Sequence, residues 1–128
     1  AIGSGMSGGI CDIWIHDCVV RGTERGIRIK SMRGRGGYVK RINVERMQMD
    51  EIEKEAIEVS MNYGSSTAMP VSQKAPEFSE IRFAHIRGNH AAVGVSLCGL
   101  PESPLRKLTL EDVSIAAEDP LREEYVEK

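Results

Sequence analysis

The sequence predicts an all-β protein whose fold is a right-handed, single-stranded parallel β-helix of about four coils. Three observations lead to this fold. One pattern of apolar and polar residues occurs four times, the segments between its copies differ in length, and no Asn-Gly or Asp-Gly pair marks a hairpin turn. Repeats of this kind are typical of solenoids, in which stacked neighbours bury a common core. We expect residues 1–128 to form a single domain.

The four copies start at Ile13, Ile42, Ile81 and Leu108, and so recur after 29, 39 and 27 residues. Stacking the copies places their apolar residues in four inward columns. These columns are Ile13-Ile42-Ile81-Leu108, Ile15-Val44-Phe83-Leu110, Cys18-Met47-Ile86-Val113 and Val20-Met49-Gly88-Ile115. Fifteen of the sixteen positions are apolar, and Gly88 is the exception. The change of phase between the second and third columns predicts a corner between two short strands.

Further elements follow from the segments between the repeats. A second strand is expected in each of the first three coils, at residues 27–29, 57–59 and 93–95. Residues 62–77 are polar and predict a surface loop. A short helix is expected to cap the C-terminal end over residues 119–128, because Asp119 suits an N-cap and Pro120 the first helical position. The first coil should present an open edge, which predicts a homo-oligomer formed through that edge.

The composition excludes several classes of protein. A net charge of −2 gives no general attraction to nucleic acid or to an anionic membrane. No apolar run approaches ~20 residues, and the N-terminus lacks a signal-peptide pattern. Cys11, Cys18 and Cys98 have no Cys-x-x-Cys spacing, so we expect neither a disulfide framework nor a zinc site. No cofactor or metal site is expected, since the three histidines also lack ligand spacing.

The segment Gly26-Ile27-Arg28-Ile29-Lys30 alternates apolar and cationic side chains, as a strand with one buried face does. Arg28 and Lys30 would then lie side by side on the outer face, roughly 6.6 Å apart. Two cations at that distance repel each other unless an anion is near. A ligand carboxylate or phosphate is one candidate anion. The carboxylate of Glu58, expected beside Arg28 in the next coil, is the other candidate, in a surface ion pair worth at most about 1 kcal/mol.

The Arg-Ile-Lys triplet, the upstream segment Ile2–Gly9 and the downstream Arg33-Gly34-Arg35-Gly36-Gly37 resemble the polygalacturonase (pectinase) family of glycoside hydrolases, family 28. The resemblance implies the same parallel β-helix and, in secreted or periplasmic relatives, inverting hydrolysis of α-1,4-galacturonosidic bonds in pectin. It also implies that Arg28 and Lys30 bind a galacturonate carboxylate and that Tyr63 contacts the substrate. From the residues alone, Tyr63 is equally consistent with a half-buried position at a strand end.

The resemblance implies that the family's catalytic carboxylates lie upstream in Asn-Thr-Asp and Asp-Asp motifs, followed by a Gly-His-Gly motif, and none of these three motifs occurs in this chain. We therefore expect a C-terminal portion of a polygalacturonase-like hydrolase, truncated relative to the family and inactive alone. Two alternatives are a non-catalytic binder of acidic carbohydrate and a remnant β-helix that self-associates. Gly3–Gly8 satisfies a dinucleotide fingerprint, but no strand precedes it in this chain, so we reject that function.

Overall fold

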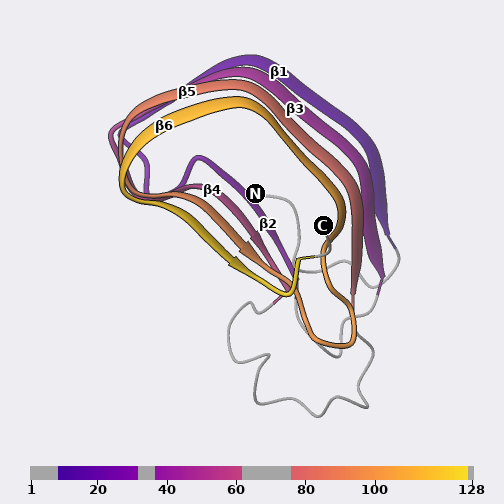
Figure 1. Ribbon diagram of the computed structural model, residues 1–128. Coiled ribbons are helices and arrows are strands. Elements are labelled where there is room, and N and C mark those ends of the chain that lie inside the picture. The colour runs from indigo at the N-terminus through magenta and orange to yellow at the C-terminus, as the bar shows by residue number, and fades with distance from the viewer. Residues whose placement is uncertain (1–8, 32–36, 62–75, 127–128) are drawn as a thin grey trace.

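The structure is a computed structural model that describes residues 9–31, 37–61 and 76–126. Its elements are all strands, and each pairing between strands is parallel (Figure 1). They are β1 (Ile10–Arg21), β2 (Ile27–Lys30), β3 (Tyr38–Asp50), β4 (Ile52–Ser60), β5 (Glu77–Cys98) and β6 (Arg106–Glu124). β1, β3, β5 and β6 stack along one arc, and β2 and β4 stack with the second halves of β5 and β6 beneath it. This curled, stacked arrangement confirms the predicted parallel β-helix.

The register of the arc confirms the four predicted columns. Ile13 lies opposite Ile42, Ile42 opposite Ile81, and Ile81 opposite Leu108. The other three columns pair in the same way. Gly88, the exception to the apolar pattern, is explained by close packing, because a Cβ atom there would lie 2.6 Å from the carbonyl oxygen of Met49. The backbone of the neighbouring coil occupies the space that a side chain would need.

The predicted corner is present, and its residues share an unusual backbone conformation. Asp17, Arg46, His85 and Asp112 stack at this corner, each with φ between 52° and 55°. A second corner, which was not predicted from the sequence, stacks Asp12, Arg41, Glu80 and Lys107, with φ between 50° and 58°. L-residues seldom adopt this left-handed region, at a cost of about 1–3 kcal/mol each. The charges at the second corner alternate in sign along the stack, which favours this arrangement.

The second ladder agrees with the prediction in its first two coils and extends further than predicted. Ile27 pairs with Ile57 and Ile29 with Val59. In the third coil Ile57 pairs with Val95, after a register irregularity between Ile52 and Glu55. Glu77, the last residue of the predicted loop, is the first residue of β5, and residues 62–75 of that loop lie outside the described residues.

The predicted C-terminal helix is wrong. Residues 119–124 belong to β6, where Asp119 pairs with Val93 and Leu121 with Val95. The second half of β5 provides a long row of backbone groups, and pairing with it satisfies the chain along its whole length, whereas the capping signals act only locally. Pro120 fits because it lies on the last strand of the stack, where a missing N–H is tolerated.

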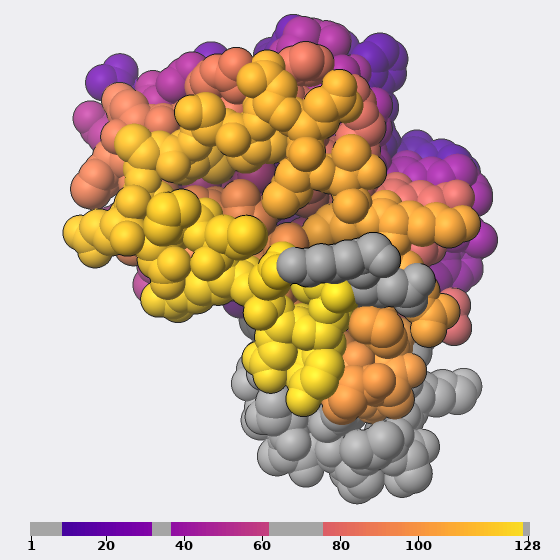
Figure 2. All heavy atoms as spheres, viewed as in Figure 1, coloured from indigo at the N-terminus to yellow at the C-terminus, as the bar shows by residue number. Residues whose placement is uncertain are grey.

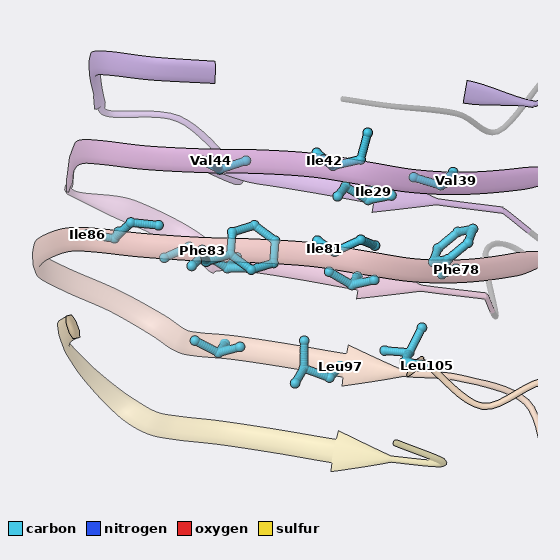
Figure 3. Packing of buried hydrophobic residues seen from close by; sticks show 14 of the residues in the cluster. Ile29, Val39, Ile42, Val44, Phe78, Ile81, Phe83, Ile86, Leu97 and Leu105 are labelled. Carbon is cyan, nitrogen blue, oxygen red and sulfur yellow. The ribbon is translucent and has the colours of Figure 1, made fainter. Parts of the chain in front are cut away.

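The core lies between the arc and the second ladder (Figure 3). Its fully buried side chains come mainly from β3, β4 and β5, and include Phe78, Phe83, Ile81 and Ile42, each at most 1% exposed. Residues at the same columns in β1 and β6 are partly buried, apart from Cys18 and Leu110, which are exposed. The coil of β6 covers the front of the molecule in the space-filling view (Figure 2). In the described part of the chain, no helix is long and apolar enough to cross a membrane.

Candidate functional site

β2 holds the two cationic side chains on a strand whose other face is anchored in the core. Ile29 is fully buried, and Ile27 packs against the core cluster. The parallel ladder continues past the strand, because Ser31 N–H donates to the carbonyl of Ser60 at 2.9 Å. Arg28 and Lys30 therefore lie on the opposite face of β2, side by side, as the alternation of the sequence predicts. Both side chains are partly exposed.

Arg28 is paired with Glu58 of the next coil. Its Nε–H donates to Oε1 of Glu58 at 2.8 Å. The side chain of Glu58 is only 8% exposed and that of Arg28 is 23% exposed. The second interpretation of the sequence, an Arg28–Glu58 ion pair, is therefore present, but it is more buried than a surface pair.

Arg25 is a third member of this cluster, although it lies outside the alternating pattern that predicts β2. Its Nε–H donates to Oε2 of Glu55 at 2.9 Å and to Oε2 of Glu58 at 3.1 Å. Burial lowers the pKa of Arg25, but the carboxylates of Glu55 and Glu58 outweigh it and raise the pKa above its ordinary value. A signal was available, since Arg25 and Arg28 precede Glu55 and Glu58 by the same 30 residues that separate the paired positions Ile27 and Ile57.

Lys30 lies beside Ser60 in the register. Further along the stack these outer positions are occupied by Ser96 and Cys98 of β5 and by Arg122 and Glu124 of β6. Burial, Glu124 and Glu58 together raise the pKa of the Cys98 thiol, which makes it a poor nucleophile near neutral pH. All three cysteines are free thiols. Tyr63, Arg33 and Arg35 lie outside the described residues.

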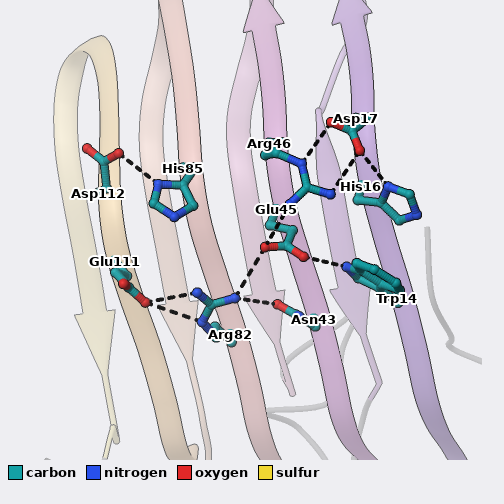
Figure 4. Close-up of polar contacts among 10 residues, drawn as sticks. All are labelled: Trp14, His16, Asp17, Asn43, Glu45, Arg46, Arg82, His85, Glu111 and Asp112. Carbon is teal, nitrogen blue, oxygen red and sulfur yellow. Dashed lines mark hydrogen bonds and ion pairs between the residues drawn. The ribbon is translucent and has the colours of Figure 1, made fainter.

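A polar network covers the outer face of the arc (Figure 4). Glu45 accepts a hydrogen bond from Nε1 of Trp14 at 2.7 Å and lies 3.6 Å from Arg82. Arg46 donates two hydrogen bonds to Asp17, at 2.8 and 2.9 Å. The hydrogen bond from Trp14 is the main cause that lowers the pKa of Glu45. These contacts join charged and polar side chains of neighbouring coils on the outer face of the arc.

The histidines of this face pair with carboxylates. His16 Nδ1 lies 2.6 Å from Asp17, and His85 Nδ1 lies 2.9 Å from Asp112. Hydrogen bonds from Arg46 and then His16 hold the pKa of Asp17 far below its ordinary value. Within residues 9–31, 37–61 and 76–126, no group of three or more His, Cys, Asp or Glu side chains is placed to hold a metal ion.

A cavity lies away from β2, where β5 and β6 begin. Its polar lining carries both signs of charge, from Glu77, Glu102, Arg106 and Lys107. Neither Arg28 nor Lys30 lines it. The candidate carboxylate-binding residues therefore form an outer surface of a ladder and not the wall of this cavity.

Residues 1–125 match the family described as Glycosyl hydrolases family 28. The chain belongs to this family. It is 38% identical to a probable polygalacturonase of Vitis vinifera over 116 residues, which are 90% of this chain and 23% of that protein. It is 29% identical to endopolygalacturonase B of Aspergillus niger over 104 residues, 77% of this chain and 28% of that protein. A probable polygalacturonase of Arabidopsis thaliana is 26% identical over 106 residues, 81% of this chain and 24% of that protein.

The family match confirms the resemblance that the Arg-Ile-Lys triplet and its flanking segments indicate. This family 28 chain spans about a quarter of the length of the curated relatives it matches. The match covers all six described strands, including the ion-paired cluster around Glu58.

Proposed function

We propose that this family 28 chain binds a galacturonate carboxylate of a pectin-like oligosaccharide through Arg28 and Lys30. The observation that carries the proposal is the placement of these two cations together on the outer face of β2, with Ile29 fixed in the core between them. Arg offers a planar fork to a carboxylate and Lys a compact charge. A rigid strand holds them in a fixed relation, so a ligand loses less freedom on binding.

Tyr63 is the proposed third contact. It follows the end of β4 by three residues in the sequence. An aromatic ring offers an apolar face to the C–H groups of a sugar, and its hydroxyl offers a hydrogen bond. Together the three residues would recognise an acidic sugar ring by its charge and by its flat face.

We also propose that this chain does not hydrolyse the glycosidic bond by itself. Inverting hydrolysis needs two carboxyl groups roughly 6.5–9.5 Å apart, one to protonate the leaving oxygen and one to activate water. Glu58, the carboxylate beside Arg28, is 8% exposed and engaged by two arginines, so it is poorly suited to either role. The motifs that supply the family's catalytic carboxylates do not occur in the sequence.

A calorimetric titration with a short oligogalacturonate tests the binding. We expect saturable binding by the wild-type chain, none by the Arg28→Ala/Lys30→Ala double variant, and none of a neutral oligosaccharide of equal length. Arg46→Ala is the matched control, because Arg46 also pairs with a carboxylate but lies on β3, in the arc across the core from β2. Absence of binding by a folded wild-type chain would overturn the proposal. Release of reducing ends from polygalacturonate would contradict the proposal that this chain does not hydrolyse the glycosidic bond by itself.

A second copy of the chain is the proposed protein partner, through β1. Among the described strands, β1 pairs with β3 alone, so its other edge carries backbone groups without a strand partner there. Its inward residues Ile13, Ile15 and Val20 are apolar and only partly buried. Edges of this kind pair readily with another chain. Native mass measurement decides the matter, and a strict monomer at high concentration would contradict this partner.

A further inference from the structure

Glu58 connects two arginines of the preceding coil through its two oxygens. Oε1 accepts from Arg28 Nε–H at 2.8 Å, and Oε2 accepts from Arg25 Nε–H at 3.1 Å. The carboxylate is the most buried member of the cluster, at 8% exposure against 19% for Arg25 and 23% for Arg28. Its backbone belongs to β4, whose neighbours Ile57 and Val59 are fully buried. Glu58 therefore has little freedom to move away from the two guanidinium groups.

An arginine bound at Nε has the plane of its guanidinium group set by its partner. A free arginine samples many rotamers, and a ligand that needs one orientation must pay for ordering the side chain. The hydrogen bond from Arg28 to Glu58 fixes that orientation before any ligand arrives. Charge-assisted hydrogen bonds of this kind are stronger than neutral ones.

A carboxylate beside Arg28 also has a cost, because its negative charge repels an anionic ligand. Arg25 reduces that cost. It contacts Glu58 with the same nitrogen that contacts Glu55, and it lies against Glu24 as well. The negative charge of Glu58 is thus neutralised by two cations, Arg25 and Arg28, and not by Arg28 alone.

We propose that Glu58 is a positioning residue for the carboxylate site: it fixes the orientation of Arg28, while Arg25 offsets its charge. This inference rests on the proposed function, since Arg28 must bind the ligand for its orientation to matter. The alternative is that Glu58 acts only through its charge. The two roles predict opposite results, because removal of a negative charge alone strengthens the binding of an anion, whereas loss of orientation weakens it.

Three substitutions at position 58 separate these roles. Glu58→Gln keeps an oxygen that accepts from Arg28 but removes the charge, so we expect oligogalacturonate affinity equal to or tighter than that of the wild type. Glu58→Ala removes both, and we expect affinity to fall by about tenfold. Glu58→Asp keeps the charge but withdraws it by one methylene, so it too should weaken binding. This milder variant decides between the roles if Glu58→Ala does not fold.

The experiment is calorimetric titration of these variants with the same oligogalacturonate, alongside Asp17→Ala as the matched control. Asp17 orients Arg46 through two hydrogen bonds on the arc, so its removal should leave affinity unchanged. A second readout needs no ligand: the Arg28 Nε–H proton, identified by its loss in Arg28→Ala, is followed by NMR. We expect it to exchange slowly in the wild type and in Glu58→Gln, and rapidly in Glu58→Ala.

The outcomes distinguish this inference from the function on which it rests. If the wild type binds, Arg28→Ala abolishes binding, and Glu58→Ala and Glu58→Asp bind as tightly as the wild type, the positioning role is overturned and the carboxylate site stands. Rapid exchange of Arg28 Nε–H in the folded wild type would also overturn it. A folded wild-type chain that fails to bind removes the function and, with it, the role of Glu58 in binding.

Discussion

The first and last coils of the stack are built on the same repeat but differ in the edge that they present. On β1 the inward positions carry Ile13, Ile15 and Val20, all apolar. On the second half of β6 the positions beside buried Val93 and Leu97 carry Asp119 and Glu123. Charged residues at inward positions, and proline on an edge strand, are devices that prevent an edge from pairing with another chain. Pro120 adds the second device to β6.

The repeat therefore sets the register of a strand but does not set whether the residues along its unpaired edge are apolar or charged. The arc of β6 keeps the apolar columns of the repeat, with Leu108, Val113 and Ile115 packed against the core. Its second half, after Ala117, departs from the apolar pattern at Asp119 and Glu123 and keeps Leu121 beside Val95. The first coil has no such departure, and it also exposes large apolar side chains on its outer face, with Trp14 at 58% and Val19 at 74%.

The largest expected effect on stability comes from removing a core side chain in the middle of the stack. This loss is the reference against which substitutions in the first and last coils are compared. Phe83 and Leu110 occupy one column, at 0% and 40% exposure. We expect Phe83→Ala to lower the free energy of unfolding by about 3–5 kcal/mol, because it empties a filled core position. Leu110→Ala should cost about 1 kcal/mol, since much of its side chain is already in water. Denaturant unfolding measures both, and equal losses would contradict the view that the end coils are less buried.

A charge on the inner face of β1 should prevent this edge from pairing with another chain, as the inward charges do on β6. We expect Ile15→Glu to abolish self-association and to lower the free energy of unfolding by about 1–3 kcal/mol, because a carboxylate then faces the core. Val19→Glu adds the same charge on the outer face of the same strand and is the control. Sedimentation velocity checks both variants, and an equal loss of association in the two would show that charge alone, not its direction, is responsible.

Removing a charge from β6 should have the opposite and smaller effect. Glu123 lies beside Leu97 in the register, so Glu123→Leu adds an apolar side chain at an inward position. We expect a change in stability of about 0.5–1 kcal/mol in the favourable direction and new association through β6. Glu118→Leu is the control, since Glu118 follows inward-facing Ala117 and lies on the other face. Unchanged association in Glu123→Leu would mean that Pro120 and Asp119 suffice to protect the edge.

The smallest effect is the response to acid of the exposed corner pairs. The hydrogen bond from Arg41 is the main cause that lowers the pKa of Asp12 from 3.8 to about 2. A carboxyl group whose pKa is lowered on folding stabilises the folded state at pH values above its ordinary pKa. This contribution is lost as the pH falls through about 2. Asp12→Asn should therefore flatten the decline of the melting temperature between pH 4 and pH 2. An identical decline in wild type and variant would show that this pair adds nothing to stability.

At the other end of the stack, hydrogen bonds from His85 and then Arg87 lower the pKa of Asp112. Both ends therefore carry corner carboxylates that are stabilised in the charged form. The sign of the acid response is the same for the two ends, and Asp112→Asn should flatten the same decline. Melting curves of the two single variants compare the ends directly.

The columns, the corner at Asp17 and Arg46, and the placement of Arg28 and Lys30 on one face of a strand were predictable from the sequence. These follow from apolar periodicity, which is local and repeats every coil. The resemblance carried by Arg-Ile-Lys and its flanking segments identified the family, which the match over residues 1–125 confirms.

Where local and distant interactions compete, the packing of the coils against one another determines which conformation the chain adopts. Residues 119–124 carry helix-capping signals, yet they form a strand because β5 offers a partner for their whole length. Arg41 and Arg46 adopt a left-handed conformation that their residue type disfavours, because stacking on Asp12 and Asp17 of the first coil fixes the corners. The sharing of Glu58 by Arg25 and Arg28 likewise depends on packing between coils, which brings together side chains 30 and 33 residues apart.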